Sequence, residues 1–239
     1  MSGIRFFAPD IADTLTLPES DSGHAVRVLR MKAGDSLEAV DGRGHIYRCR
    51  LTDAHHKHAR VEIEDITTVS KTWSGTITLG IAPTKSNDRM EWLVEKLVEM
   101  GIDRIVPLRC RRSERKDINI ERLERVAVAA MKQSLKATLP IIDPTTPYPA
   151  FLEQMSASNS HKFMAYCDPA FERRLFAREF VAGADTAILI GPEGDFAPEE
   201  IETAIAGGWI PVSFGESRLR TETAALFAVA ACHALSAKT

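Results

Sequence analysis

The chain has 239 residues, of which 44% are hydrophobic and 26% charged, and its formal net charge is −3. This is the composition of an ordinary globular protein with enough apolar material for one large or two modest domains, and its small negative charge argues against a surface coated in positive potential. No apolar run is long enough to span a bilayer, and the first ten residues lack the apolar segment of a signal peptide, so we expect a cytoplasmic protein.

Residues 4–69 read as short alternating segments separated by turns, which predicts a small, mostly β domain, and we expect a barrel. The three clearest strands are expected at 35–40, 46–51 and 59–66. The first two flank Asp41–Gly44, a stretch typical of a hairpin turn. A short helix is expected from Ser20 to Leu29, with Ser20 or Asp21 as its N-cap.

The polar stretch 70–75 is expected to link this first domain, residues 1–70, to a second domain over residues 75–239. Strands and helices alternate in the second domain, which predicts an α/β fold with parallel strands. Its strands are expected at 76–82, 104–108, 162–167, 186–190 and 210–214. Its helices are expected at 89–100, 120–136, 198–206 and 222–234.

Two glycine-bearing loops each follow a short apolar strand in the last fifty residues. The first is Gly191-Pro192-Glu193-Gly194, and the second runs from Gly215 to Arg220. Ligands bind at the carboxyl ends of strands in open α/β sheets, so two such loops predict one shared site on neighbouring strands. Gly-x-Gly-x-x-Gly, P-loop and Gly-x-Ser-x-Gly motifs are absent, which removes the main support for other common α/β sites.

Basic residues gather at three places. Arg218 and Arg220 precede the expected helix at 222–234, where they add to the positive field of the helix N-terminus and are unfavourable unless an anion or acidic surface binds there. Thr221 is interpreted as the N-cap of that helix. Two further basic patches comprise Arg109, Arg111, Arg112 and Arg115, and Arg27 and Arg30. Such patches alone do not distinguish a phosphate-bearing partner from a solvated face.

Cysteine and histidine show no metal-binding pattern. The four cysteines are scattered without a Cys-x-x-Cys pair, so we expect reduced thiols rather than disulfides or a zinc site. The run His55-His56-Lys57-His58 has no second ligand pair at a suitable spacing, and we interpret it as a solvated turn between strands. No metal is expected.

The two glycine loops carry a specific resemblance. Gly-Pro-Glu-Gly-Asp-Phe at 191–196 and Arg-Leu-Arg-Thr-Glu-Thr-Ala at 218–224 resemble the C-terminal motifs of the RsmE family, the 16S ribosomal RNA uridine-N3 methyltransferases of the SPOUT superfamily. Lys85, Met90-Glu91 and the basic run after Ile105–Leu108 resemble the opening of the family's catalytic domain.

The resemblance extends through most of the chain. Phe6-Phe7 and residues 24–35 are similar to the family's N-terminal PUA-like RNA-binding domain. Gln133-Ser134 matches a family Gln-Ser pair, but Leu135-Lys136 stand where Gly-Arg commonly follows.

What the resemblance implies is a trefoil-knotted α/β domain preceded by a PUA-like β-barrel, a homodimer, and S-adenosylmethionine bound in the knot. The implied substrate is 16S ribosomal RNA of the small subunit, held partly by the basic patches. Carried over by position, the cofactor-binding residues are Ile190, Gly191, Gly194, Phe214, Gly215 and Leu219.

Methylation at N3 of uridine needs help, because this nitrogen is a poor nucleophile until its proton is removed. Glu193 is our candidate base, since a loop carboxylate between two glycines can reach the edge of a base. Arg220 is our candidate for stabilising negative charge on the uridine or binding a phosphate. The alternatives are that Glu193 only bonds loop backbone, and that Arg220 pairs with Glu222 or a partner subunit.

Two other functions stay open at this point. The first is a SPOUT methyltransferase acting on a different RNA, which the PUA-like segment and the Arg-Thr-Glu-Thr motif disfavour. The second is a non-catalytic RNA-binding protein with this fold. The glycines at 191, 194 and 215 disfavour the second, because a chain that no longer binds the cofactor need not keep such loops.

Overall fold

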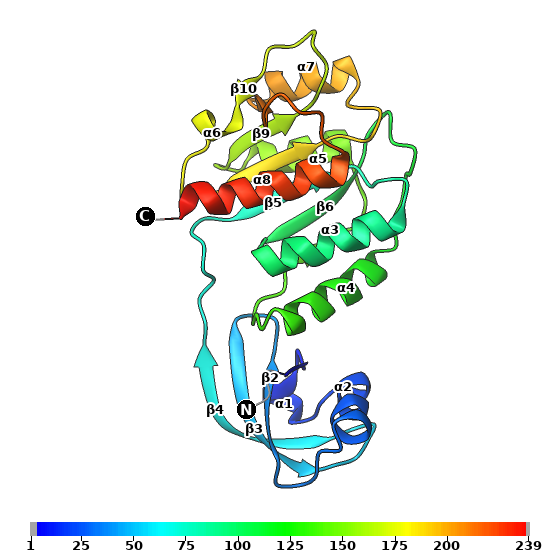
Figure 1. Ribbon diagram of the computed structural model, residues 1–239, viewed down its shortest axis with the longest axis vertical. Helices are drawn as coiled ribbons and strands as arrows, with labels where there is room; N and C mark the ends of the chain where they lie inside the picture. Colours follow the sequence, from blue (N-terminus) through cyan, green and yellow to red (C-terminus); the bar gives the residue numbers. More distant parts are fainter. Residues whose placement is uncertain (1–3, 238–239) are drawn as a thin grey trace. The chain divides into compact units, whose positions relative to one another are not determined.

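The computed structural model describes residues 4–237 and divides into two compact units (Figure 1). The first unit holds the chain up to Thr72 together with Val128–Leu139, and the second holds Trp73–Ala127 and the chain from Pro140 onward. Helix α4 (Ile120–Gln133) therefore begins in the second unit and ends in the first.

The first unit is built on a four-stranded sheet in the order β1-β2-β3-β4. Its strands are β1 (Arg5–Phe7), β2 (Ser36–Val40), β3 (His45–Asp53) and β4 (Arg60–Thr68). β1 pairs parallel with β2 and the other pairs are antiparallel, which leaves β1 and β4 at the two edges of this order. Alternate residues of β3, namely Tyr47, Cys49 and Leu51, are buried in the core, as its alternating pattern requires. The expected strand pair around Asp41–Gly44 is confirmed.

Two short helices, α1 (Ile11–Thr14) and α2 (Glu19–Gly23), precede β2, and α2 continues into a π-helical turn, His24–Val28. The expected helix is present, but its expected N-cap is wrong. The N-cap position is Pro18, and no side chain caps the helix. Asp21 is instead buried and accepts a hydrogen bond from Lys132 Nζ at 2.5 Å.

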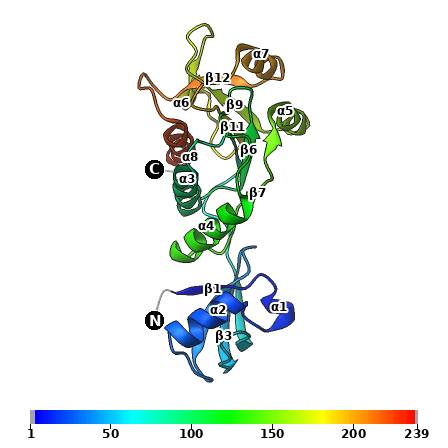
Figure 2. The same cartoon turned by 90° about the vertical axis from the view of Figure 1, so that its right-hand side faces the viewer.

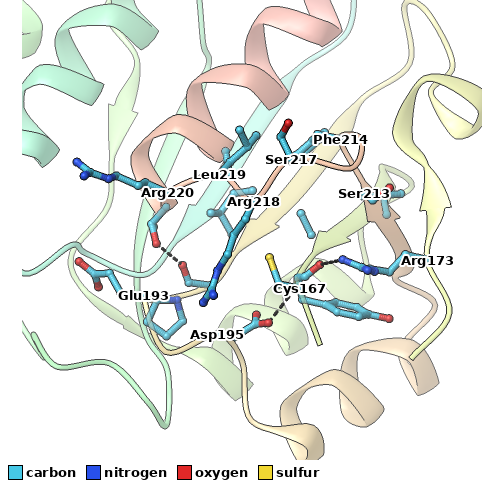
Figure 3. A pocket seen from close by; sticks show the side chains of 18 of the residues that line it. Cys167, Arg173, Glu193, Asp195, Ser213, Phe214, Ser217, Arg218, Leu219 and Arg220 are labelled. Carbon is cyan, nitrogen blue, oxygen red and sulfur yellow. Dashed lines mark hydrogen bonds between the residues drawn. The ribbon is translucent and has the colours of Figure 1, made fainter. Parts of the chain in front are cut away.

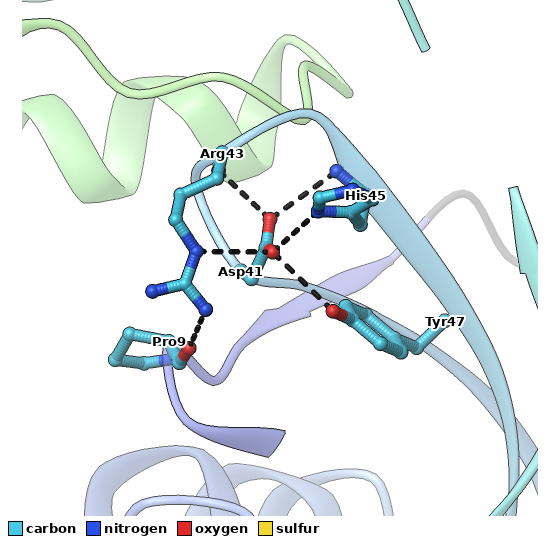
Figure 4. A network of polar contacts seen from close by, with 5 residues as sticks. All are labelled: Pro9, Asp41, Arg43, His45 and Tyr47. Carbon is cyan, nitrogen blue, oxygen red and sulfur yellow. Dashed lines mark hydrogen bonds and ion pairs between the residues drawn. The ribbon is translucent and has the colours of Figure 1, made fainter. Parts of the chain in front are cut away.

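A buried carboxylate organises the turn between β2 and β3 (Figure 4). Asp41 accepts hydrogen bonds from the Arg43 amide at 2.7 Å, from the His45 ring at 2.7 Å and from the Tyr47 hydroxyl at 3.3 Å. Burial alone raises the pKa of the Asp41 carboxyl, but the hydrogen bonds outweigh burial and hold that pKa below its ordinary value. The turn is thus fixed by charge-assisted hydrogen bonds.

The segment Val128–Leu139, which holds the end of α4 and the residues after it, is bound to the turn between β2 and β3 of the first unit. The Gly44 amide donates to Ala137 O at 2.9 Å, and the Leu139 amide donates to Gly42 O at 2.8 Å. The Arg5 guanidinium donates to the carbonyl oxygen of Leu135. Leu135 itself has φ +54°, a left-handed conformation that glycine adopts far more easily.

The second unit contains a parallel sheet in the order β10-β12-β9-β11-β5-β6-β7, with β8 paired to β6. Its longer strands are β5 (Ile77–Ile81), β6 (Arg104–Arg109), β9 (His161–Ala165), β11 (Thr186–Ile190) and β12 (Ile210–Ser213). The short ones are β7 (Ile141–Ile142), β8 (Thr146–Pro147) and β10 (Arg174–Leu175). The predicted parallel α/β fold is confirmed.

Helices cover both faces of this sheet (Figure 2). One face carries α3 (Asn87–Met100) and α8 (Thr221–Ser236), and the other carries α5 (Tyr148–Ser156) and α7 (Pro198–Ala206). A short helix, α6 (Phe176–Glu179), follows β10. Every residue of β5 and β11 is buried, as expected for central parallel strands covered on both faces. Between residues 4 and 237, no helix has the length and apolar content needed to cross a membrane.

Candidate active site

Three strand ends surround one cavity of about 460 Å³, a size typical of small-molecule sites (Figure 3). The glycine loops follow β11 and β12, and β9 lies between these two strands in the sheet. The expectation that the two loop-bearing strands are neighbours is therefore wrong. The loops nevertheless meet at one site, because parallel strands end at the same edge of the sheet.

Most of the residues expected to bind the cofactor line this cavity. They are Ile190, Gly191, Phe214, Gly215 and Leu219. Gly194 lies just outside the lining, where an added Cβ would be 3.6 Å from Arg112 Cβ. Gly191 is more tightly enclosed, since an added Cβ would lie 2.9 Å from Phe196 Cδ2. Gly215 has open space around it but adopts φ +125°, which side chains disfavour.

A single side chain joins the two glycine loops. The Thr221 hydroxyl donates to Gly191 O at 3.2 Å. The expectation that Thr221 is the N-cap of α8 is wrong, because the N-cap position is Arg220 and Thr221 is the first helical residue. The short hydroxyl side chain serves the other loop rather than its own helix.

The third strand end contributes residues that our sequence analysis did not assign to the site. Cys167 lines the cavity after β9, and its amide donates to Asp195 Oδ2 at 2.8 Å. Asp195 also accepts from the Phe196 amide at 2.9 Å and has φ +61°. The Arg173 guanidinium donates to Tyr166 O at 2.8 Å. The one sequence signal for this third loop is the turn-forming Asp168-Pro169 directly after the expected strand.

The two candidate catalytic residues both line the cavity. Glu193 is exposed, and its Oε1 accepts a hydrogen bond from the Lys85 amide at 3.0 Å. Arg220 is exposed, and its side chain makes no hydrogen bond or ion pair with any residue that the structure describes. Glu222 lies nearest to a different guanidinium, with its Oε1 3.7 Å from Arg89 Nε.

The basic patch after β6 holds neighbouring loops in place. Arg112 Nη1 donates to Phe196 O at 3.1 Å and to Gly194 O at 3.3 Å. Arg115 Nη2 donates to Lys85 O at 2.8 Å. The Arg111 side chain pairs with Glu199 at 3.3 Å. These arginines thus support the cavity loops, whereas Arg109 is exposed at the end of β6.

The other basic pair lies in the first unit. Arg27 and Arg30 are both exposed, one within the π-helical turn and one just after it. Arg30 has φ +55°. The structure therefore brings Glu193, Arg220 and the expected cofactor residues together, and presents Arg27 and Arg30 on the surface of a separate unit.

Comparisons with known proteins assign both units. A family model described as an RNA methyltransferase domain matches residues 71–233, and one described as an RNA methyltransferase PUA domain matches residues 17–64.

Three known proteins illustrate the similarity. The crystal structure of a probable rRNA-methyltransferase from Porphyromonas gingivalis matches over 98% of each chain at 45% identity, with a TM-score of 0.91. A ribosomal RNA small subunit methyltransferase E from Neisseria gonorrhoeae, solved with S-adenosyl methionine bound, matches over 97% of each chain at 28% identity, with a TM-score of 0.81. A protein of the same name from Rickettsia conorii is 28% identical over 207 residues, which is 85% of this chain and 82% of that protein.

Proposed function

This chain belongs to the RsmE family of RNA methyltransferases, and on that premise we propose that it methylates N3 of a specific uridine in 16S ribosomal RNA of the small subunit. The relatives named above carry the names of ribosomal RNA methyltransferases, and the one from Neisseria gonorrhoeae was solved with S-adenosyl methionine bound. The observation that carries the proposal is the cavity between the two family motifs, 191–196 and 218–224. The hydrogen bond from Thr221 to Gly191 joins these two motifs.

The cavity suits S-adenosylmethionine, which supplies an activated methyl group on a positively charged sulfur. Gly191 and Gly215 allow backbone amides and carbonyls to approach a flat adenine. Ile190, Val212 and Leu219 provide apolar walls, and the carboxylates of Glu193 and Asp195 provide negative charge at the same site. We propose that Ile190, Gly191, Phe214, Gly215 and Leu219 contact the cofactor directly. Gly194 acts through the shape of its loop.

We propose Glu193 as the acceptor of the uridine N3 proton. One of its oxygens is bonded to the Lys85 amide, which orients the carboxylate and leaves the other oxygen available. Arg220 is proposed to stabilise the negative charge that develops on the uracil oxygens, since its guanidinium has no competing partner among the described residues. Once the proton is removed, correct positioning of N3 in line with the methyl–sulfur bond supplies much of the rate.

We propose two basic surfaces as RNA contacts. Arg27 and Arg30 are exposed in the first unit, and the patch in the second unit comprises Arg109, Arg111, Arg112 and Arg115. Phosphate contacts of this kind make binding strongly dependent on salt. A cytoplasmic location remains our prediction, since ribosomal RNA is the proposed substrate.

A trefoil knot and a homodimer are also part of the proposal. The bond between Thr221 and Gly191 supports the knot, because it shows the last loop of the chain lying against the loop after β11. Exposed aromatic side chains support the dimer. Trp92 on α3 is 43% exposed and Phe227 on α8 is 47% exposed, whereas Val229 is fully buried in the core of its own chain.

The decisive experiment is methyl transfer from labelled S-adenosylmethionine to small ribosomal subunits and to free 16S RNA that lack the modification, followed by nucleoside analysis. We expect 3-methyluridine. Transfer only to another RNA would favour a different SPOUT methyltransferase, and failure to bind the cofactor would refute the enzyme. Glu193→Gln and Arg220→Ala test the two roles, since either variant with full turnover removes that residue from the mechanism.

A further inference from the structure

The turn between β3 and β4 carries three histidines whose rings stack on one another. The ring centroids of His55 and His58 are 3.6 Å apart, with the planes 24° from parallel. Those of His55 and His56 are 4.8 Å apart, with the planes 25° from parallel. Nδ1 of His55 also accepts a hydrogen bond from the Lys57 amide at 3.3 Å. Residues 55–58, which we call the histidine turn, therefore present their imidazoles as one stacked group.

The histidine turn is fixed against α2. The buried Ser22 hydroxyl on α2 accepts a hydrogen bond at 2.9 Å from the Ala59 amide, directly after the histidine turn. A Cβ added at Gly23, the last residue of α2, would lie 3.6 Å from His56 O. The π-helical turn follows α2 without a break. The histidine turn therefore lies beside the segment that carries the exposed arginines of the first unit.

Positive charge surrounds the stack. The pKa of the His56 imidazole lies below its ordinary value of 6.5, first because the ring is partly removed from water, and then because positive groups lie beside it. These groups are Arg27, His55 and Lys57. Glu19 on α2 lies 3.8 Å from Lys57 Nζ and has a weaker, opposite effect on the pKa of His56. His56 is therefore mostly uncharged at neutral pH, although its surroundings are cationic.

The carboxylates nearby do not balance this charge. Asp53 and Arg60, where β3 and β4 flank the histidine turn, lie opposite each other and carry opposite charges. Within residues 4–237, no carboxylate lies at ion-pair distance from Arg27 or Arg30, and both arginines are exposed. A phosphate bound beside the histidine turn would therefore meet the charge of Arg27 without a competing carboxylate from the described part of the chain.

We propose that the histidine turn and Arg27 together bind a backbone phosphate of the RNA substrate, and that the histidine stack takes up a proton from solution on binding. The phosphate contributes the negative charge that this face lacks, and so favours the imidazolium form of a histidine. Two protonated rings in contact repel each other, so we expect the stack to take up about one proton as a unit. Arg27 keeps the role already proposed for it, and the histidines add a contact whose strength depends on pH.

The position of these residues in the chain supports RNA as the ligand. The π-helical turn and the histidine turn both fall within residues 17–64, the segment that matches the RNA methyltransferase PUA domain. A phosphate contact carries no sequence information, so this site holds the RNA in place rather than selecting the methylated uridine. The inference thus rests on the proposed function and deepens it, because it couples RNA binding by the first unit to the uptake of a proton.

The test compares RNA affinity across pH. Filter binding at constant ionic strength, with free 16S RNA that lacks the modification, measures the Kd between about pH 8 and 5. The variant replaces the whole stack, as His55→Asn, His56→Asn and His58→Asn together. We expect wild-type affinity to rise about tenfold more than that of the triple variant, since a change of one unit in pKa on binding corresponds to a tenfold change in affinity. At about pH 8 the two proteins should bind about equally, because the histidines are uncharged there.

Three further measurements make the result specific. Calorimetric titration in two buffers of different ionisation enthalpy, at about pH 6.5, should show uptake of up to about one proton by the wild type and less by the triple variant. Arg27→Gln should weaken binding at every pH and lower the slope of log affinity against log salt by about one. His161→Asn, at a histidine of the second unit, is the matched control and should keep the wild-type pH dependence.

The outcomes separate this site from the proposed function. The same pH dependence in the triple variant as in the wild type, or a loss of affinity in that variant that is equal at every pH, would overturn the proton-linked site alone. So would RNA binding by the wild type without proton uptake. Absence of RNA binding and of methylation by the wild-type chain at every pH would refute the proposed function as well.

Discussion

The Thr221 hydroxyl donates to the Gly191 carbonyl oxygen at 3.2 Å and joins two loops that are 30 residues apart in the sequence. Thr221→Val keeps the shape of the side chain and removes the donor, which leaves a buried carbonyl without this partner. We expect S-adenosylmethionine affinity to fall about fivefold, corresponding to about 1 kcal/mol for one neutral hydrogen bond. Isothermal titration calorimetry measures this change. Thr223→Val, at the exposed threonine of the same motif, is the matched control, and equal affinities for both variants would contradict the prediction.

The two glycines of the first loop should differ in their tolerance of a methyl group. In Gly191→Ala the added Cβ lies 2.9 Å from the Phe196 ring and 3.3 Å from the Phe196 amide nitrogen, so the loop must shift. Strain of this kind typically costs about 1–3 kcal/mol, and we expect cofactor affinity to fall about tenfold or more. In Gly194→Ala the nearest atom is 3.6 Å away, an ordinary contact. Cofactor titration should therefore show a near-normal affinity for Gly194→Ala, and a larger loss there than in Gly191→Ala would be inconsistent with this geometry.

Cys167 should be the one thiol that reacts readily in the folded protein. It is exposed and lines the cavity, whereas Cys49, Cys110 and Cys232 are buried. Burial raises the pKa of Cys49 to about 11 and that of Cys232 to about 12, and it also raises the pKa of Cys110, so these thiols stay protonated.

Labelling with N-ethylmaleimide at neutral pH, counted by intact-protein mass spectrometry, tests this difference. S-adenosylmethionine at ten times its Kd should slow the reaction about tenfold, because only the unliganded protein reacts. Cys167→Ser should remove the labelling. Unprotected labelling of Cys167 would place the cofactor elsewhere.

Asp41 should make the first unit sensitive to acid. Its hydrogen bonds hold its pKa in the folded protein below the ordinary value of 3.8, so they contribute fully to stability above that pH. As the pH falls further, the unfolded chain binds a proton first, and the free energy of unfolding decreases until the pH passes the folded pKa. Asp41→Asn should therefore show a flatter acid dependence, together with a loss of about 1–3 kcal/mol at neutral pH. Urea titrations between about pH 5 and 3 measure both effects. Asp10→Asn, at an exposed carboxylate, should leave the wild-type dependence unchanged.

Leu135 offers a stabilising substitution. Its φ of +54° is unfavourable for a side chain, and 43% of the residue is exposed, so little apolar burial would be lost on removing it. Relief of left-handed strain is worth about 1–2 kcal/mol, partly offset by about 0.5–1 kcal/mol from the greater chain entropy of glycine. We expect Leu135→Gly to raise the free energy of unfolding by up to about 1 kcal/mol. Lys136→Gly is the control and should not raise the free energy of unfolding. A lower free energy of unfolding in Leu135→Gly would show that the contacts of the leucine side chain outweigh the strain of its backbone.

The local patterns predicted the long elements well, because their signals lie within single segments. Strands β5 and β11 could be predicted from their own apolar runs, at 77–81 and 186–190. Strand β4 could be predicted from its own alternation of apolar and polar residues. Helix α5 was missed because Pro147 and Pro149 flank its first residue, a composition more typical of a loop.

The sequence predicted most of the residues of the site, but it did not predict the strand order or the contacts between the loops. The glycine motifs pointed to the right cavity, yet the position of β9 between β11 and β12 depends on strand order, which no short motif encodes. Contacts such as Asp195 with Cys167, and Thr221 with Gly191, follow from that order. They therefore became visible only in the folded chain.

The divided sequence of the first unit has a consequence for synthesis. Asp21 finds its lysine partner 111 positions later, and Arg5 finds the Leu135 carbonyl 130 positions later. The first unit cannot complete its folding until Val128–Leu139, a segment translated well after the strands of this unit, has been synthesised. All four strands of its sheet are translated by residue 68, but the unit as a whole would stay incomplete until residue 139 had left the ribosomal exit tunnel, so its folding is coupled to the growth of the catalytic domain.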